Sequence, residues 1–137
     1  MASFNKFQAW SENMVEGVNL GSDQLKIALT AAANAQVATN SVLADLTEVS
    51  YASCSSRNVT TSSSGQSGGT YKLVCADLTL TASGGTVGPL RYVVMYDDTV
   101  AGDPLLGWWD YGSEITLADT ETFALDFSAA NGVLQLS

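Results

Sequence analysis

The apolar positions change their period once along the chain. Between residues 4 and 18 they recur every three or four positions, the period of an amphipathic helix, and Ser3 is a suitable N-cap. From Leu25 onward they alternate with polar residues, as in a half-buried strand. The pattern therefore predicts a short helix or arm over residues 4–16, ended by Gly17, and β-structure beyond Leu25.

Turn residues bound each predicted strand of this second part. Alternation predicts strands over residues 25–29, 71–75, 78–82, 105–109, 115–117 and 123–127. The run Leu90–Tyr96 is apolar at most positions, which is typical of a central strand covered on both faces. Asn131-Gly132 predicts a tight hairpin that joins the strand over 123–127 to residues 133–136.

Three segments carry weaker patterns. Residues 30–41 are predicted to be a loop, and the spacing of Leu43, Leu46 and Val49 fits a helical turn that leads into an edge strand ending at Tyr51. Residues 60–69, TTSSSGQSGG, contain no side chain large enough to be buried, so a flexible surface loop is predicted there.

Together these elements predict a mainly β chain with about seven or eight short strands. We expect a single-domain antiparallel β-sandwich, jelly-roll or immunoglobulin-like, over residues 19–137, preceded by the helix or arm over residues 1–18. Periodicity carries no information on strand order.

Charge and residue types then narrow the functional classes. Five basic and 14 acidic residues give a net charge of −9, and the scattered cations form no basic stripe, so we expect no nucleic-acid partner. The absence of histidine excludes imidazole catalysis and histidine-ligated metals, so we expect no enzyme activity, cofactor or metal. No apolar run approaches the roughly 20 residues of a membrane span, and the first residues lack a signal-peptide pattern, so we expect cytoplasmic synthesis and no membrane partner.

The acidic residues and the cysteines have simple interpretations. Asp97, Asp98 and Asp103 share a predicted loop without the ligand spacing of a calcium loop, and we interpret them as a solvated turn. Asp110 and Glu114 are candidates for a glycosidase-like acid and base, but nothing in the sequence fixes their separation, and solvation at a strand edge is the preferred interpretation. Cys75 is predicted to be a buried thiol, and whether it pairs with Cys54 stays open.

Aromatic residues are the candidates for a contact surface. Adjacent Trp108 and Trp109 point to opposite faces of a strand, so one faces the core and the other faces a partner or solvent. The rings of the N-terminal segment must be buried on the sandwich itself or on a neighbouring subunit. The candidate protein–protein interface therefore comprises Phe4, Phe7, Trp10, Trp108, Trp109 and Tyr111.

Four phrases of the sequence resemble small virion proteins of tailed double-stranded DNA bacteriophages. They are NLGSDQLKIALT (19–30), LADLTEVSY (43–51), LRYVVMYDDT (90–99) and LGWWDYG (106–112), the last followed by ITL (115–117). The resemblance extends over nearly the whole chain. It implies a capsid decoration or cement protein on the virion surface that binds the outside of the head and clamps neighbouring major capsid subunits.

The resemblance implies no active site and no cofactor. It also implies that the protein assembles as a dimer or trimer. The alternative is a tail- or fibre-associated virion protein that contacts host glycans through Trp108, Trp109 and Tyr111.

Overall fold

Strands make up most of the regular structure in this computed structural model, which describes residues 3–137. Within these residues the single α-helix is α1 (Trp10–Glu16), and two 3-10 turns span Ala32–Asn34 and Leu43–Asp45; no helix there is long and apolar enough to cross a membrane. The strands are β1 (Asn5–Lys6), β2 (Leu25–Thr30), β3 (Asn58–Val59), β4 (Thr61–Ser67), β5 (Thr70–Cys75), β6 (Leu78–Thr81), β7 (Val87–Asp97), β8 (Leu105–Leu117), β9 (Thr122–Leu125) and β10 (Leu134–Leu136). The predicted mainly β chain with one short helix near its N-terminus is confirmed.

Five antiparallel strands form the first layer, in the order β1-β8-β7-β2-β3. The central pair is β7 with β2, in which Leu29 lies opposite Val93 and Leu25 opposite Asp97. On its other side β7 pairs with β8, and Val93 lies opposite Trp109. The strands with the longest apolar runs therefore occupy the centre of the sheet, where both of their faces are covered.

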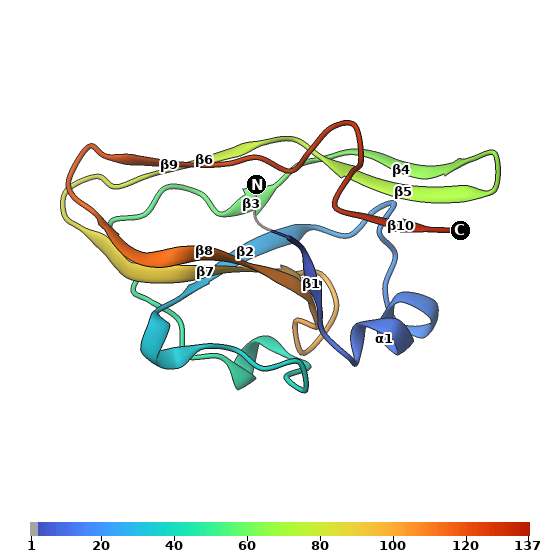
Figure 1. The fold of residues 1–137 in the computed structure, drawn as a ribbon, viewed down its shortest axis with the longest axis horizontal. Coiled ribbons are helices and arrows are strands. Elements are labelled where there is room, and N and C mark those ends of the chain that lie inside the picture. The colour runs from blue at the N-terminus through green and yellow to red at the C-terminus, as the bar shows by residue number, and fades with distance from the viewer. Residues whose placement is uncertain (1–2) are drawn as a thin grey trace.

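Two smaller antiparallel sheets, β10-β5-β4 and β6-β9, form the second layer. Figure 1 shows them end to end along one side of β2, β7 and β8, which gives a sandwich-like arrangement. Only Ala76 and Asp77 separate β5 from β6. The Asp77 carboxylate accepts a hydrogen bond from the backbone N–H of Phe127 at 3.0 Å, which ties the chain after β9 to the break between the two sheets.

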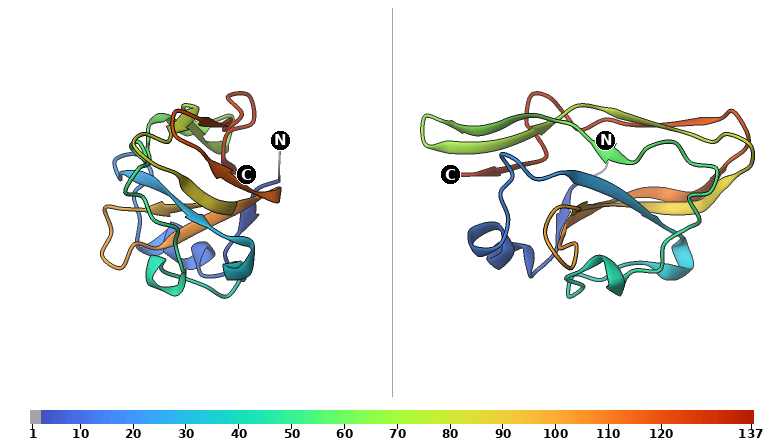
Figure 2. Two further views of the ribbon diagram at one scale, coloured as in Figure 1. Left: turned by 90° about the vertical axis from the view of Figure 1, so that its left-hand side faces the viewer. Right: turned by 180° about the vertical axis from the view of Figure 1, so that it is seen from behind.

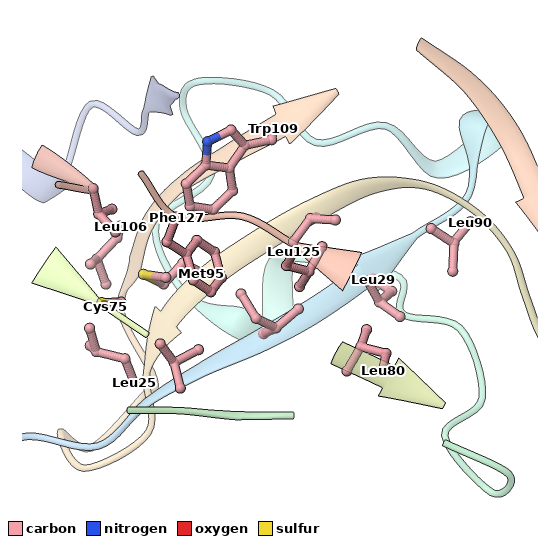
Figure 3. Close-up of a cluster of buried hydrophobic side chains, with 14 of the residues drawn as sticks. Leu25, Leu29, Cys75, Leu80, Leu90, Met95, Leu106, Trp109, Leu125 and Phe127 are labelled. Atoms are coloured by element: carbon pink, nitrogen blue, oxygen red, sulfur yellow. The ribbon is translucent and has the colours of Figure 1, made fainter. Parts of the chain in front are cut away.

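Apolar side chains from both layers fill the space between them (Figure 3). Burying one such side chain contributes about 1.5–3 kcal/mol, so this main core dominates the stability of the sandwich. Its largest contributors include Leu25, Ile27, Leu29, Leu73, Leu80, Leu90, Met95, Leu106, Trp109, Leu125 and Phe127. Cys75 is buried there as predicted, and both Cys75 and Cys54 are free thiols.

The opposite face of the five-stranded sheet is covered by residues 31–50, which run beneath β2 and β7 in Figure 1 and in the right-hand view of Figure 2. This segment is mostly irregular, in agreement with the predicted loop over 30–41 and helical turn at Leu43. Leu43 and Leu46 pack against a smaller cluster, the second core, which consists of Phe7, Ala28, Val94, Tyr96 and Leu105.

The predicted edge strand that ends at Tyr51 is absent. Residues 43–51 make one backbone hydrogen bond to β2, from the Val49 N–H to the carbonyl of Leu29. The next donor, the N–H of Leu29, is bound at 2.9 Å by the Tyr51 hydroxyl, which in turn donates to Glu48 at 2.7 Å. The tyrosine side chain thus replaces the backbone acceptor that a further strand would supply.

The N-terminal segment is shorter in helix than predicted, and residues 1–2 of the predicted arm lie outside the described residues. Asn5 and Lys6 pair with Trp108 and Gly107 of β8, and α1 begins only at Trp10. The free edge of β8 offers backbone partners to residues 5–7, and these compete successfully with the helical pattern.

The serine-rich segment over residues 60–69 is not a loop, contrary to the prediction. Thr61–Ser67 form β4, which joins β5 through the two-residue turn Gly68-Gly69, with φ angles of +60° and +88°. Both glycines take the left-handed conformation that such a hairpin requires. Backbone hydrogen bonds to β5 hold β4 in place, while Leu73 of β5 is buried, so β4 needs no apolar side chain of its own.

The prediction that Asn131-Gly132 joins two strands of one hairpin is also wrong, because the strands on either side of it do not pair with each other. β9 pairs with β6, whereas β10 pairs with β5 and places Leu134 opposite Leu73. Gly132 has a φ of +74°, and a Cβ at this position would lie 2.5 Å from the carbonyl oxygen of Leu73. The glycine therefore permits close approach to β5 and does not reverse the chain onto β9.

Candidate functional site

Trp108 and Trp109 lie on opposite faces of the five-stranded sheet, as the alternation of a strand requires. The Trp108 ring packs on Phe7 in the second core, with ring centroids 4.6 Å apart. The Trp109 ring faces the main core, where its centroid lies 5.1 Å from that of Phe4 and 5.6 Å from that of Phe127. The adjacent tryptophans therefore belong to different surroundings.

The N-terminal rings are covered by this chain itself. Phe7 and Trp10 are buried, and Phe4 is half-buried over Gly107, where any Cβ would collide with the Phe4 ring. Among the six interface candidates, Tyr111 has the most accessible side chain, with 52% of its surface exposed.

A bulge in β8 is the reason for the exposure of Tyr111. Sequence alternation predicts two strands here, but β8 is continuous, and its register with β7 jumps from Tyr92–Asp110 to Leu90–Ile115. Residues 111–114 therefore lie opposite the single residue Arg91. They are exposed, and Gly112 has a φ of +97° and its N–H bound to the Asp110 carboxylate at 2.8 Å. Bulges of this kind redirect side chains at sheet edges.

The bulge forms one wall of a groove between the two layers, which we call the aromatic groove. It has a volume of about 360 Å³. The Tyr111 and Phe123 rings meet edge to face across it, with centroids 5.3 Å apart and planes at 86°. Its lining consists of Val93, Trp109, Tyr111, Phe123, Ala124, Leu125, Asp126 and Phe127.

Sequence reasoning selected Trp109 and Tyr111 but missed the β9 half of this groove. The alternation of Phe123, Leu125 and Phe127 indicates a strand and its buried face, and nothing in that pattern shows that β9 lies across from β8. The sequence predicts a shared contact surface for Trp108, Trp109 and Tyr111, but Trp108 lies on the other face of the sheet and does not line the groove.

The candidate acid and base both have structural partners. Asp110 accepts hydrogen bonds from Arg91 Nε at 2.9 Å and from a guanidinium NH2 group at 3.2 Å. These bonds, followed by the one from Gly112 N–H, lower the pKa of Asp110 and keep it ionised. Glu114 accepts from the backbone N–H of Ala32 at 2.9 Å. This arrangement fits a structural use of both carboxylates.

The three acidic residues of the 97–103 segment have different environments. Asp98 lies 3.9 Å from the Lys26 ammonium, and Asp103 occupies the left-handed region with a φ of +52°. Asp97 is fully buried and accepts from the N–H groups of Thr99 and Val100. Within residues 3–137 no cluster of three or more acidic or cysteine side chains is arranged to hold a metal.

The second carboxylate oxygen of Asp97 has no hydrogen-bond partner among the described residues and lies beside the Asp23 carboxyl. Burial, together with this second carboxyl, raises the pKa of Asp97 to about 6. A solvated turn was the interpretation from sequence, and for Asp97 it is wrong, because the residue ends β7 inside the sandwich.

A second groove, of about 490 Å³, lies at the opposite end of the second layer. Met14 of α1, the residues after α1 and the β4–β5 hairpin line it, together with Leu136, which is itself 52% exposed.

No protein-family model, curated protein or solved structure matches this chain.

Proposed function

We propose that this protein is a phage virion structural protein, most specifically a capsid decoration or cement protein. In this role it binds the outer surface of the head and clamps neighbouring major capsid subunits. The observation that carries the proposal is the resemblance of four phrases to small virion proteins of tailed bacteriophages. These phrases correspond to β2, the cover of the second core, β7 and β8, so they describe the framework of the sandwich.

The surface chemistry supports a binding role. A net charge of −9 keeps many copies soluble before assembly. Large apolar side chains are exposed at separate places, including Val15, Val37, Tyr111 and Leu136. A cement protein that touches several subunits at once gains affinity through effective concentration, so such modest contacts suffice. The partners are the major capsid protein and further copies of this chain in a dimer or trimer.

Reconstitution tests the proposal. Purified protein is added to phage heads, and separately to phage tails, that lack it, and bound copies are counted after sedimentation. We expect a fixed stoichiometry of many copies per head and increased resistance of the heads to heat. Few copies, confined to tails, would support the tail-associated alternative, and failure to bind any particle would refute both.

A further inference from the structure

The aromatic groove lies beside two strand edges, that of β8 after Trp108 and that of β9, which have no strand partner in the described part of the chain. β8 pairs with β7 on one side and with β1 only at Gly107 and Trp108, and β9 pairs only with β6. A short turn joins β8 to β9, so the two strands lie at the same edge of the sandwich (Figure 1). Unpaired strand edges of this kind are templates for an additional strand.

The lining of the groove favours an apolar side chain over a sugar. The polar groups of its lining side chains are the Tyr111 hydroxyl, the Asp126 carboxylate and the indole N–H of the largely buried Trp109. A glycan presents many hydroxyl groups that need partners, and these three groups satisfy few of them. An apolar side chain packed against the aromatic rings of the groove needs none.

The charged side chains on β9 and beside its ends are acidic. The guanidinium of Arg91 on β7 is already paired with Asp110, and no Lys or Arg follows Arg91 in the sequence. Asp119 and Glu121 precede or adjoin the start of β9, and Asp126 follows its end. Between residues 3 and 137 none of these three carboxylates forms an ion pair. A segment with Lys or Arg beside its apolar residues would complement this edge.

We propose that the aromatic groove receives an extended segment of a partner protein that carries alternating apolar and basic side chains. The segment adds as a strand along the free edge of β9, inserts an apolar side chain toward Trp109 and Phe127, and places a basic side chain at Asp126. This inference rests on the proposed function to the extent that the partner is the major capsid subunit.

The first test compares two exposed alanines in head binding. Ala124 lies in the groove on β9, and Ala101 lies in the turn after β7, outside it. Lysine at position 124 blocks the edge and repels a basic segment, so Ala124→Lys should weaken head binding by about tenfold or more. Ala101→Lys should bind as the unmodified protein does, and circular dichroism melts show whether both variants are folded.

The second test needs no phage particle. Synthetic peptides of alternating Val and Lys, and of alternating Val and Glu, are titrated into the full-length protein while backbone amide NMR signals are recorded. We expect the Val-Lys peptide to shift signals from β8 and β9, and the Val-Glu peptide to shift none. Ala124→Lys, and N-methylation of the peptide on one edge, should each abolish the shifts.

The outcomes separate the two proposals. If the unmodified protein binds heads and Ala124→Lys binds equally well, the groove proposal is wrong and the cement function stands. If the unmodified protein binds no head, the cement function fails and the peptide titration alone decides the groove. Absence of peptide-induced shifts overturns the groove proposal. So does binding of a neutral oligosaccharide that is lost in Tyr111→Ala, which would identify a glycan site.

Discussion

The two faces of the five-stranded sheet are buried in different ways. Strands of the second layer cover one face and create the main core. Irregular residues 31–50 cover the other face and bury a much smaller cluster. Neighbouring residues of β7 contribute to different cores, since Val93 points into the main core and Val94 into the second core.

This difference shows that an apolar strand face does not require a second sheet. The second core is closed by Leu43 and Leu46, which are themselves partly exposed, and by Phe7 from the N-terminal segment. We expect a face covered by partly exposed side chains to relax more when a side chain is removed than a face covered by strands.

The largest effect is expected in the main core. Leu29→Ala removes a fully buried side chain between two sheets and should lower the free energy of unfolding by about 3–5 kcal/mol. Urea unfolding followed by circular dichroism measures the change. Leu29→Met keeps the volume and should cost less than about 1.5 kcal/mol. A loss below 1 kcal/mol for the alanine variant, on this same scale, would show that the main core also relaxes.

Asp97 is a fully buried charged residue at the end of β7, two positions after Met95 of the main core. Its pKa is raised from 3.8 to about 6, so its protonation stabilises the fold fully below pH 3.8, and this contribution is lost as the pH rises through about 6. The loss amounts to at most about 3 kcal/mol at 1.36 kcal/mol per pKa unit.

Asp97→Asn keeps the acceptor for Thr99 and Val100 and offers an amide donor to Asp23. We expect the variant to be more stable than the unmodified protein at pH 7.5 and to lack the decline between pH 4 and 7, as measured by urea unfolding at a series of pH values. Parallel pH profiles for the two proteins would contradict the proposed titration of Asp97.

Leu105→Ala makes the comparison on the second face. Leu105 is fully buried, but its neighbours Leu43 and Leu46 lie on an irregular segment that can close part of the cavity. We expect a loss of about 2 kcal/mol, at the low end for this substitution. If urea unfolding gives a loss as large as that of Leu29→Ala, the irregular cover is as rigid as a sheet.

The smallest effect concerns the point where the irregular cover returns to β2. Tyr51→Phe removes the hydroxyl that binds the N–H of Leu29 and should cost about 1 kcal/mol, because that donor loses its partner. Hydrogen exchange provides the specific readout, since the Leu29 amide should exchange faster while the Ile27 amide, bonded to the Arg57 carbonyl, is unchanged. Unaltered exchange at Leu29 would show that the hydroxyl is dispensable.

Local patterns predicted the elements whose side chains alternate. The strands at Leu25, Tyr71, Leu78 and Leu90 appear within a few residues of their predicted positions, because one buried face imposes a two-residue period. β4 was missed because its serines and glycine carry no such period, and backbone bonds to β5 alone define it. The partner of β10 was missed because strand pairing between distant residues leaves no local pattern.

Part of the candidate site could also be predicted from the local pattern, and part could not. Alternation alone places Trp108 and Trp109 on opposite faces, since the period of a strand is two. The aromatic groove requires the bulge after Asp110 and the stacking of β9 beside β8, which are properties of the register and of the sheets.

The sequence by itself determined the β class, the central position of Leu90–Tyr96, the acidic surface and the shortage of catalytic residue types, because these depend on composition and local period. Tertiary structure alone decided which strands pair, what covers the second face, that Phe7 and Trp10 are buried within the chain, and that four aromatic rings meet in one groove. These features depend on contacts between residues far apart in the chain. Each such contact contributes a small packing or hydrogen-bond energy, and the sum of many of them determines which arrangement is most stable.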